Sequence, residues 1–144
     1  MSNASLRDAS VVVARDKNDL VALLSADFPT HAGPHLFLPG GRREDGESPL
    51  NCARRELREE AGVSAEHWTP LGSHAITLQS PARVHLFEAR RLTLGAQKLT
   101  ATEHDFQLMW WPMEDALRAV SAGRFLLPAG PLALLLAERR SRYR

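Results

Sequence analysis

The chain has 144 residues, of which 24% are charged, and its formal net charge is +1. This length suits one domain with a sizeable core, and the near-neutral charge gives no argument for binding nucleic acid or an acidic membrane. The single cysteine, Cys52, excludes an internal disulfide and favours a reducing compartment.

The N-terminus carries no targeting pattern. Residues 1–4, Met-Ser-Asn-Ala, are typical of a cloning scar, so one domain is expected over residues 5–144. The start lacks the apolar core of a signal peptide, and the apolar run at 128–137 is too short to span a membrane. We therefore expect a cytoplasmic protein with no membrane partner.

Three short strands are predicted in the first part of the chain. Apolar residues at 11–14 and 20–24 predict two strands joined by a turn at 16–19. Residues 28–34 contain two prolines and are expected to form a loop before a short strand at 35–38. Gly40 and Gly41 follow, and glycine allows a backbone that a metal or a phosphate can approach closely.

A helix is predicted over residues 49–61, because signals for both of its ends are present. Ser48 can cap the N-terminus, Pro49 suits the first helical position, and Gly62 provides the C-terminal stop. At about 100° per residue, apolar positions form one stripe that would face the core. These positions are Leu50, Ala53, Leu57 and Ala61.

The second half of the chain continues the alternation of strands and helices. Strands are predicted at 71–78, 83–90 and 106–111, and helices at 113–122 and 131–142, with Leu117 and Val120 facing inward. Mixed strands with flanking helices predict a single α/β domain, an α/β/α sandwich with a mixed β-sheet.

Three glutamates give the predicted helix at 49–61 an unusual face. Glu56, Glu59 and Glu60 stand at i, i+3 and i+4, so their like charges lie close together on the helix. Such a cluster is usually a solvated, salt-bridged surface, a reading that stays open for the bare pattern. The preceding glycine turn favours a metal site instead, and hard carboxylate oxygens suit Mg²⁺ or Mn²⁺.

The spacing around these glutamates resembles the complete signature of the Nudix hydrolases. The matching pattern is Gly41-x5-Glu47-x7-Arg55-Glu56-Leu57-x-Glu59-Glu60-x-Gly62-Val63. The resemblance implies the Nudix fold over residues 5–144 and hydrolysis of a pyrophosphate bond in a nucleoside diphosphate linked to another group, with Mg²⁺ or Mn²⁺. Its substrate would be a small nucleotide rather than a nucleic acid.

Site residues follow from the resemblance position by position. Glu56, Glu59 and Glu60 resemble the metal ligands, and Gly41 resembles the residue that offers a carbonyl oxygen to the metal. Arg55 resembles the arginine that orients the glutamates. The resemblance gives Glu47 a weaker role, closer to support of the loop.

One further acid is a candidate outside this pattern. Glu103 lies where the family often keeps another carboxylate near the metals, although a solvated loop acid fits the sequence equally well. Cys52 has no His or Asn partner and is expected to be a structural filler. Of the adjacent Trp110 and Trp111, at most one is expected to face a pocket.

The substrate is less sharply indicated than the reaction. Residues 80–90 resemble the segment after the motif in ADP-ribose pyrophosphatases, with Pro81 18 residues beyond Val63. The short segment before residue 11 departs from that subgroup. We expect ADP-ribose or a related nucleoside diphosphate sugar. The alternatives are a (deoxy)nucleoside triphosphate pyrophosphohydrolase and a non-catalytic nucleotide-binding module. The oligomeric state stays open, a homodimer included.

Overall fold

Two β-sheets form the framework of the computed structural model, which describes residues 6–143. The residues expected to be a cloning scar lie outside this range. In spatial order, the strands of the first sheet are β4 (Gly40–Arg42), β1 (Ala9–Ala14), β6 (Arg83–Leu94) and β5 (Val63–Ala75). Those of the second sheet are β3 (His31–Phe37), β2 (Leu20–Phe28) and β7 (Gln107–Pro112).

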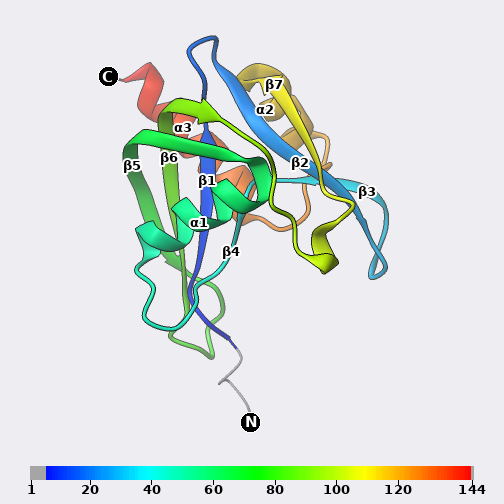
Figure 1. The fold of residues 1–144 in the computed structure, drawn as a ribbon, viewed down its shortest axis with the longest axis vertical. Coiled ribbons are helices and arrows are strands. Elements are labelled where there is room, and N and C mark those ends of the chain that lie inside the picture. The colour runs from blue at the N-terminus through cyan, green and yellow to red at the C-terminus, as the bar shows by residue number, and fades with distance from the viewer. Residues whose placement is uncertain (1–5, 144) are drawn as a thin grey trace.

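The first sheet is mixed and the second is antiparallel. Strand β1 runs parallel to β6 and antiparallel to β4, and β5 pairs antiparallel with β6. Helix α1 (Pro49–Ala61) covers one face of the first sheet, and α3 (Ala129–Arg142) lies on its other face (Figure 1). Helix α2 (Met113–Ser121) packs beside α3. The predicted α/β/α sandwich with a mixed sheet is confirmed.

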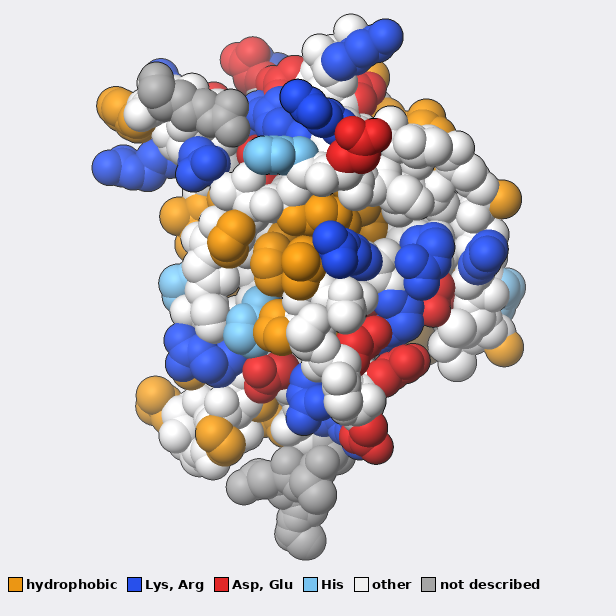
Figure 2. All heavy atoms as spheres, turned by 60° about the vertical axis from the view of Figure 1, so that its left-hand side comes forward, with side chains coloured by type: hydrophobic (Ala, Val, Ile, Leu, Met, Phe, Trp, Pro, Cys, Tyr) orange, Lys and Arg blue, Asp and Glu red, His pale blue; other side chains and the backbone are white. Residues whose placement is uncertain are grey.

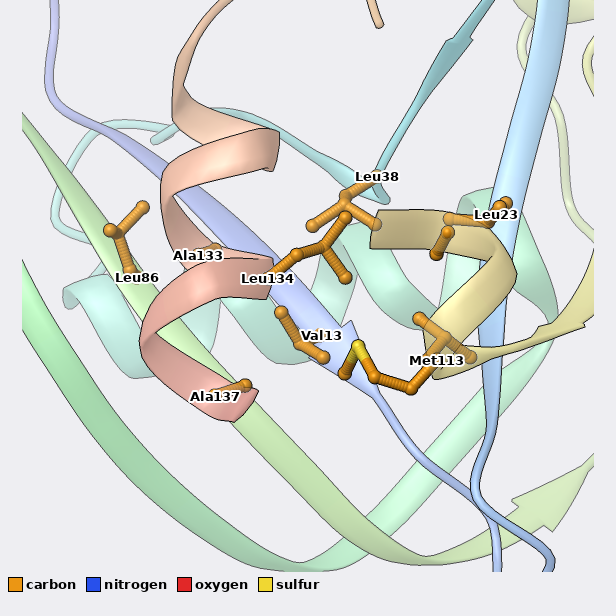
Figure 3. Packing of buried hydrophobic residues seen from close by; sticks show 10 residues of the cluster. Val13, Leu23, Leu38, Leu86, Met113, Ala133, Leu134 and Ala137 are labelled. Atoms are coloured by element: carbon orange, nitrogen blue, oxygen red, sulfur yellow. The ribbon is translucent and has the colours of Figure 1, made fainter. Parts of the chain in front are cut away.

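Alternate residues of β1 enter two separate cores, as the period of a strand requires. Val12 and Ala14 pack under α1, in a cluster with Ala53 and Leu57 of that helix. Val13 belongs to the opposite cluster, under α3. Figure 3 shows its members converging from β1, β2, β6, α2 and α3. Each helix therefore has a fixed place on the sheet.

The ends of α1 match the sequence prediction. Asn51 N–H donates to Ser48 Oγ over 3.1 Å, Pro49 opens the helix, and Gly62 takes a left-handed conformation with φ 70°. The amide of Gly62 donates to the Arg58 carbonyl, which closes the last turn. These caps fix the length of the helix, and so fix which residues share its acidic face.

The prediction of a loop at 28–34 is wrong, because β2 and β3 form a hairpin there. Strand β2 continues to Phe28 and β3 begins at His31, so only Pro29 and Thr30 make the turn. Pro34 is tolerated within β3 because this strand lies at the edge of its sheet, where a missing N–H breaks no ladder.

The strand predicted at 71–78 is misplaced. Strand β5 starts directly after the cap of α1, at Val63, and ends at Ala75, while Leu78 lies in the following turn and is 97% exposed. As an edge strand, β5 keeps many exposed polar residues, and its register shifts between Pro70 and Gly72. These features hide the strand pattern from sequence inspection.

The remaining elements agree with the sequence within a few residues, apart from β4, which was expected only as a glycine turn. In α2 the fully buried positions are Met113, Ala116 and Ala119, while Leu117 and Val120 are partly buried against the core. Among residues 6–143, no helix combines the length and hydropathy needed to cross a membrane.

One face of the molecule carries mixed side chains. Figure 2 shows apolar side chains gathered near its middle, with acidic and basic side chains around them. Neither sign of charge forms a continuous surface there, in keeping with the formal net charge of +1.

Candidate metal centre

Three carboxylates from two distant segments meet beside α1. Oxygens of Glu56, Glu60 and Glu103 all lie within 4.8 Å of one another. Glu56 and Glu60 come from the acidic face of α1 and are almost fully buried, with 7% and 4% of their surfaces exposed. Glu103 ends a short 3-10 helix, η2 (Ala101–Glu103), and is partly buried. The structure therefore brings Glu103 to the helix, as the sequence suggested.

The glycine turn packs directly against these carboxylates. Gly40 N–H donates to Glu60 Oε1 over 2.9 Å, which fixes the orientation of that side chain. A Cβ on Gly41 would overlap the Glu56 carboxylate, so only glycine fits at this position without a shift. The sequence indicated a close approach at these glycines, but gave no sign that Gly40 itself would bind Glu60.

Arg55 organises the acidic side chains from the edge of the cluster. Its Nε and Nη2 donate to the two carboxylate oxygens of Glu47, over 2.7 and 3.0 Å. Its Nη1 donates to Glu56, and to Glu59 Oε1 over 3.3 Å. The guanidinium of Arg55 thus connects the loop before α1 to two glutamates of the helix. It can do so because its N–H donors point in fixed directions and bind two carboxylate oxygens at once.

Glu47 and Glu59 stand apart from the three converging carboxylates. Both oxygens of Glu47 are bound by Arg55, and Glu47 Oε1 also accepts the Glu44 amide over 2.9 Å. Glu59 pairs with Arg55, and its side chain is 30% exposed. The role of Glu59 as a metal ligand stays a prediction.

The segment that carries Glu103 is bound to the C-terminal end of α1. The last carbonyls of a helix have no partner within it and need donors from elsewhere. Lys98 N–H donates to the Glu59 carbonyl over 2.7 Å, and Gln97 Nε2 donates to the Glu60 carbonyl over 2.8 Å. These bonds hold the segment just before Glu103 against the end of α1.

The electrostatics of the carboxylate cluster favour binding of a cation. Burial raises the pKa of the Glu60 carboxyl, and the nearby Glu56 charge raises it further. Burial also raises the pKa of Glu56, against the lowering effect of the Arg55 guanidinium. Fully ionised carboxylates this close repel one another, and a positive ion among them would remove that cost.

A cavity of about 580 Å³ adjoins the cluster through the glycine turn. Gly40 and Gly41 line it, as does Arg42, whose carbonyl accepts a hydrogen bond from Arg55 over 3.0 Å. Another part of the lining is the loop at 126–128 with the start of α3, a contact that the sequence did not indicate. That loop is placed by pairing with β3, where Leu126 N–H donates to the Leu36 carbonyl over 2.9 Å.

Other candidate residues lie away from this site. Trp110 and Trp111 pack partly buried against opposite cores, so neither lines the cavity. Asp105, an acid close to Glu103 in the same loop, is exposed and lies outside the cluster. Burial raises the pKa of the Cys52 thiol to about 11, which fits a filler rather than a nucleophile.

A model of the NUDIX domain matches residues 5–129. The chain belongs to the Nudix family. Its Nudix box is the segment from Gly41 to Val63, which forms β4, the Arg55 network and α1. The same match also covers the segment that carries Glu103 and the loop at 126–128.

Two groups of Nudix relatives resemble the chain. An 8-oxo-dGTP diphosphatase from Proteus vulgaris is 32% identical over 66% of this chain and 76% of its own length. An ADP-ribose pyrophosphatase from Mycobacterium tuberculosis is 30% identical over 82% of this chain and 58% of its own length. Across the curated relatives, the matched part covers between 25% and 76% of the relative's length.

The fold of this chain is similar to that of a solved structure. A crystal structure described as that of an ADP compounds hydrolase superposes with a TM-score of 0.78, covering 96% of this chain and 75% of that one. The two sequences are 18% identical, so this likeness concerns the fold alone.

The residues of the Nudix box, together with Glu103, fit a divalent metal ion. The three converging groups offer hard oxygen ligands, and the absence of a Cβ at Gly41 leaves the Glu56 carboxylate directly against the backbone. Family membership and the acidic cluster together support the use of a divalent metal.

Proposed function

We propose that this Nudix protein is a pyrophosphohydrolase that uses Mg²⁺ or Mn²⁺. The convergence of Glu56, Glu60 and Glu103 carries the proposal, because three carboxylates with oxygens within 4.8 Å of one another offer the hard donor set that a small divalent cation takes. Family membership and relatives named as pyrophosphatases or diphosphatases support it.

The chain's own residues would hold the reactants. A divalent ion bound by Glu56, Glu59, Glu60 and the Gly41 carbonyl would neutralise the diphosphate and lower the pKa of an attacking water. Arg55 keeps the glutamates in position, and a carboxylate of the cluster, Glu103 included, accepts the proton of that water. The glycine turn leaves space for phosphate oxygens to approach.

We propose a nucleoside diphosphate sugar such as ADP-ribose as the substrate class. Support comes from the M. tuberculosis relative, whose match covers 82% of this chain, and from the resemblance of residues 80–90 to that subgroup. The rival is a (deoxy)nucleoside triphosphate, favoured by the P. vulgaris relative. The two substrate classes give different products. A nucleoside diphosphate sugar yields a nucleoside monophosphate and a sugar phosphate, whereas a triphosphate yields a nucleoside monophosphate and pyrophosphate.

One experiment tests both levels of the proposal. Purified protein is assayed with ADP-ribose, ATP, dGTP and 8-oxo-dGTP in Mg²⁺, Mn²⁺ or EDTA, and products are separated by ion-exchange chromatography. We expect turnover only with a divalent ion, and the highest kcat/KM for ADP-ribose. No turnover with any compound would favour a binding module, whereas a tenfold preference for a triphosphate would overturn the substrate class alone.

A further inference from the structure

The segment between β6 and β7 carries Glu103 but has little packing of its own. Within residues 95–106, here called the Glu103 arm, only Gln97, Leu99, Glu103 and Phe106 are partly buried, and the others are exposed. Figure 1 shows the arm passing the C-terminal end of α1 before the chain returns as β7. With so few buried contacts, individual hydrogen bonds must set the position of Glu103.

The first anchor of the arm is the end of α1. The backbone amides of Gly95 and Lys98 each donate to a carbonyl there over 2.7 Å, a bond that any residue except proline can make. Gln97 differs, because its side-chain Nε2 donates to the Glu60 carbonyl over 2.8 Å. Residue 97 is therefore the position at which this anchor depends on the identity of a side chain.

Thr100 connects this anchor to the carboxylate of Glu103. The Thr100 amide donates to Glu103 Oε1 over 3.2 Å, and the Glu103 amide donates to the Thr100 carbonyl over 3.0 Å. These two bonds orient both the backbone and the side chain of Glu103 relative to Thr100. Since Thr100 is only three residues beyond Gln97, a shift of the anchor is passed on to the carboxylate.

The second anchor of the arm does not involve α1. The ring centroid of Phe106 lies 4.9 Å from that of Phe37 and 6.4 Å from that of Phe28, in edge-to-face contacts. The Phe106 amide also donates to the Glu103 carbonyl over 2.8 Å. This anchor holds one end of the arm when the first is weakened, so the loss of Gln97 should displace Glu103 without unfolding the protein.

We propose that Gln97 is a positioning residue that keeps Glu103 in the carboxylate cluster. Its effect on turnover rests on the proposed pyrophosphohydrolase function, whereas its effect on metal binding does not. Partners that orient metal ligands from outside contribute about 10–100-fold to metal affinity or activity. A residue that only satisfied the Glu60 carbonyl would affect stability alone, because water can serve a carbonyl at a helix end.

Gln97→Met tests the proposal, because it removes the N–H donor and nearly keeps the length of the side chain. We expect the Kd for Mn²⁺, measured by electron paramagnetic resonance, to rise about tenfold. The kcat should fall about tenfold with KM within twofold, and the melting temperature should drop by less than about 4 °C. The matched control is Gln79→Met, the same change at an exposed glutamine outside the cluster and the cavity. A Mn²⁺ Kd within twofold of the wild type in Gln97→Met would overturn the proposal.

A double-mutant cycle shows whether Gln97 acts through Glu103. Once Glu103→Gln has removed the charge, Gln97 has no carboxylate left to position. The double variant should therefore match Glu103→Gln within about twofold, both in the Kd for Mn²⁺ and in kcat. Independent losses that multiply would overturn the proposal. If nothing is hydrolysed but the Mn²⁺ cycle is non-additive, the proposed function fails and the role of Gln97 stands.

Hydrogen exchange gives a readout that needs no metal. In the metal-free protein, Gln97→Met should speed exchange of the Lys98 and Thr100 amides, which hold the arm to α1 and to Glu103. Gln79→Met should leave both rates unchanged. Equal rates in the wild type and Gln97→Met would show that the side chain does not hold the arm, and would overturn the proposal.

Discussion

Arg55 shows how a single side chain can hold an acidic site together. Its guanidinium binds Glu47 through two hydrogen bonds and reaches Glu56 and Glu59 on the helix. The hydrogen bonds to Arg55 lower the pKa of Glu47, so Glu47 is held as a carboxylate. Glu56 and Glu60, by contrast, have pKa values raised by burial. Similar glutamates in one short segment thus meet very different environments.

The first prediction concerns Glu60, the most buried carboxylate of the cluster. Glu60→Gln keeps the size of the side chain but removes a charge proposed to bind the metal ion. If that interaction contributes about 4 kcal/mol to the transition state, kcat should fall on the order of 10³-fold. Circular dichroism should show an intact fold, and Mg²⁺ should raise the melting temperature of the wild type more than that of the variant. A variant that keeps a tenth of wild-type activity would contradict this role.

The second prediction separates Glu47 from the carboxylate cluster. Since both oxygens of Glu47 are bound by Arg55, Glu47→Gln should mainly loosen the loop before α1. We therefore expect Glu47→Gln to lower kcat/KM less than Glu56→Gln does, when both are measured at saturating Mg²⁺. Equal losses would place Glu47 among the metal ligands.

At the scale of the elements, the sequence predicts structure well wherever local signals suffice. Helix α1 has a cap at each end and a clear apolar stripe, and its observed bounds match the prediction. Strand β5 was misplaced because its polar edge positions and its bulge at Pro70 and Gly72 resemble a loop. Edge strands are stabilised by one neighbour only, so their sequences carry a weaker pattern.

Asp8 joins the start of β1 to β6 and gives a prediction at this scale. Its side chain accepts the Arg83 amide over 3.0 Å and contacts His85 Nε2 over 2.9 Å. These bonds, the one to His85 first, lower its pKa below the ordinary value of 3.8. Asp8→Ala should cost about 1 kcal/mol of stability at pH 7, measured by urea unfolding.

The pH dependence of this cost follows from the direction of the pKa shift. Folded Asp8 holds its proton less tightly than the unfolded chain, so its contribution is complete above pH 3.8. It is lost as the pH falls from there through the lower folded pKa. The control is Asp45→Ala, whose carboxylate is 90% exposed and should contribute less than about 0.5 kcal/mol. A difference between wild type and Asp8→Ala that persists unchanged at pH 3 would refute the assignment.

At the scale of the whole molecule, the candidate site depends on contacts between distant parts of the chain. The sequence pattern identified the glutamates of α1, Arg55 and the glycine turn, because all of them lie within the box. It could not place the loop at 126–128 beside the glycine turn, since that contact depends on a bridge between Leu36 and Phe125. The walls of the cavity depend on such long-range contacts, whereas the residues of the box lie in one short segment. The reaction was therefore easier to predict than the substrate.

The last prediction concerns a buried ion pair that joins the sheet to α3. Arg15 and Glu88 are 3% and 2% exposed and pair over 3.2 Å. Arg15 also donates to the Ala137 carbonyl over 3.3 Å and to Ser141 Oγ over 2.8 Å, so it links the end of β1 to β6 and to α3. None of these residues belongs to the carboxylate cluster or the cavity.

Breaking this pair should destabilise the fold without altering the chemistry. Arg15→Met leaves the buried Glu88 carboxylate with Arg90, whose Nε lies 3.3 Å from Glu88 Oε1, as its remaining partner. We expect a loss of about 3 kcal/mol in the free energy of unfolding, measured with urea. The double variant Arg15→Met/Glu88→Leu removes both charges and should recover most of that loss, because an apolar pair of similar size carries no desolvation penalty. The kcat/KM of the folded double variant should stay within about twofold of the wild type, since neither Arg15 nor Glu88 lies in the carboxylate cluster or lines the cavity. If the double variant were less stable than Arg15→Met, the pair would be a net source of stability and this account of the buried network would be wrong.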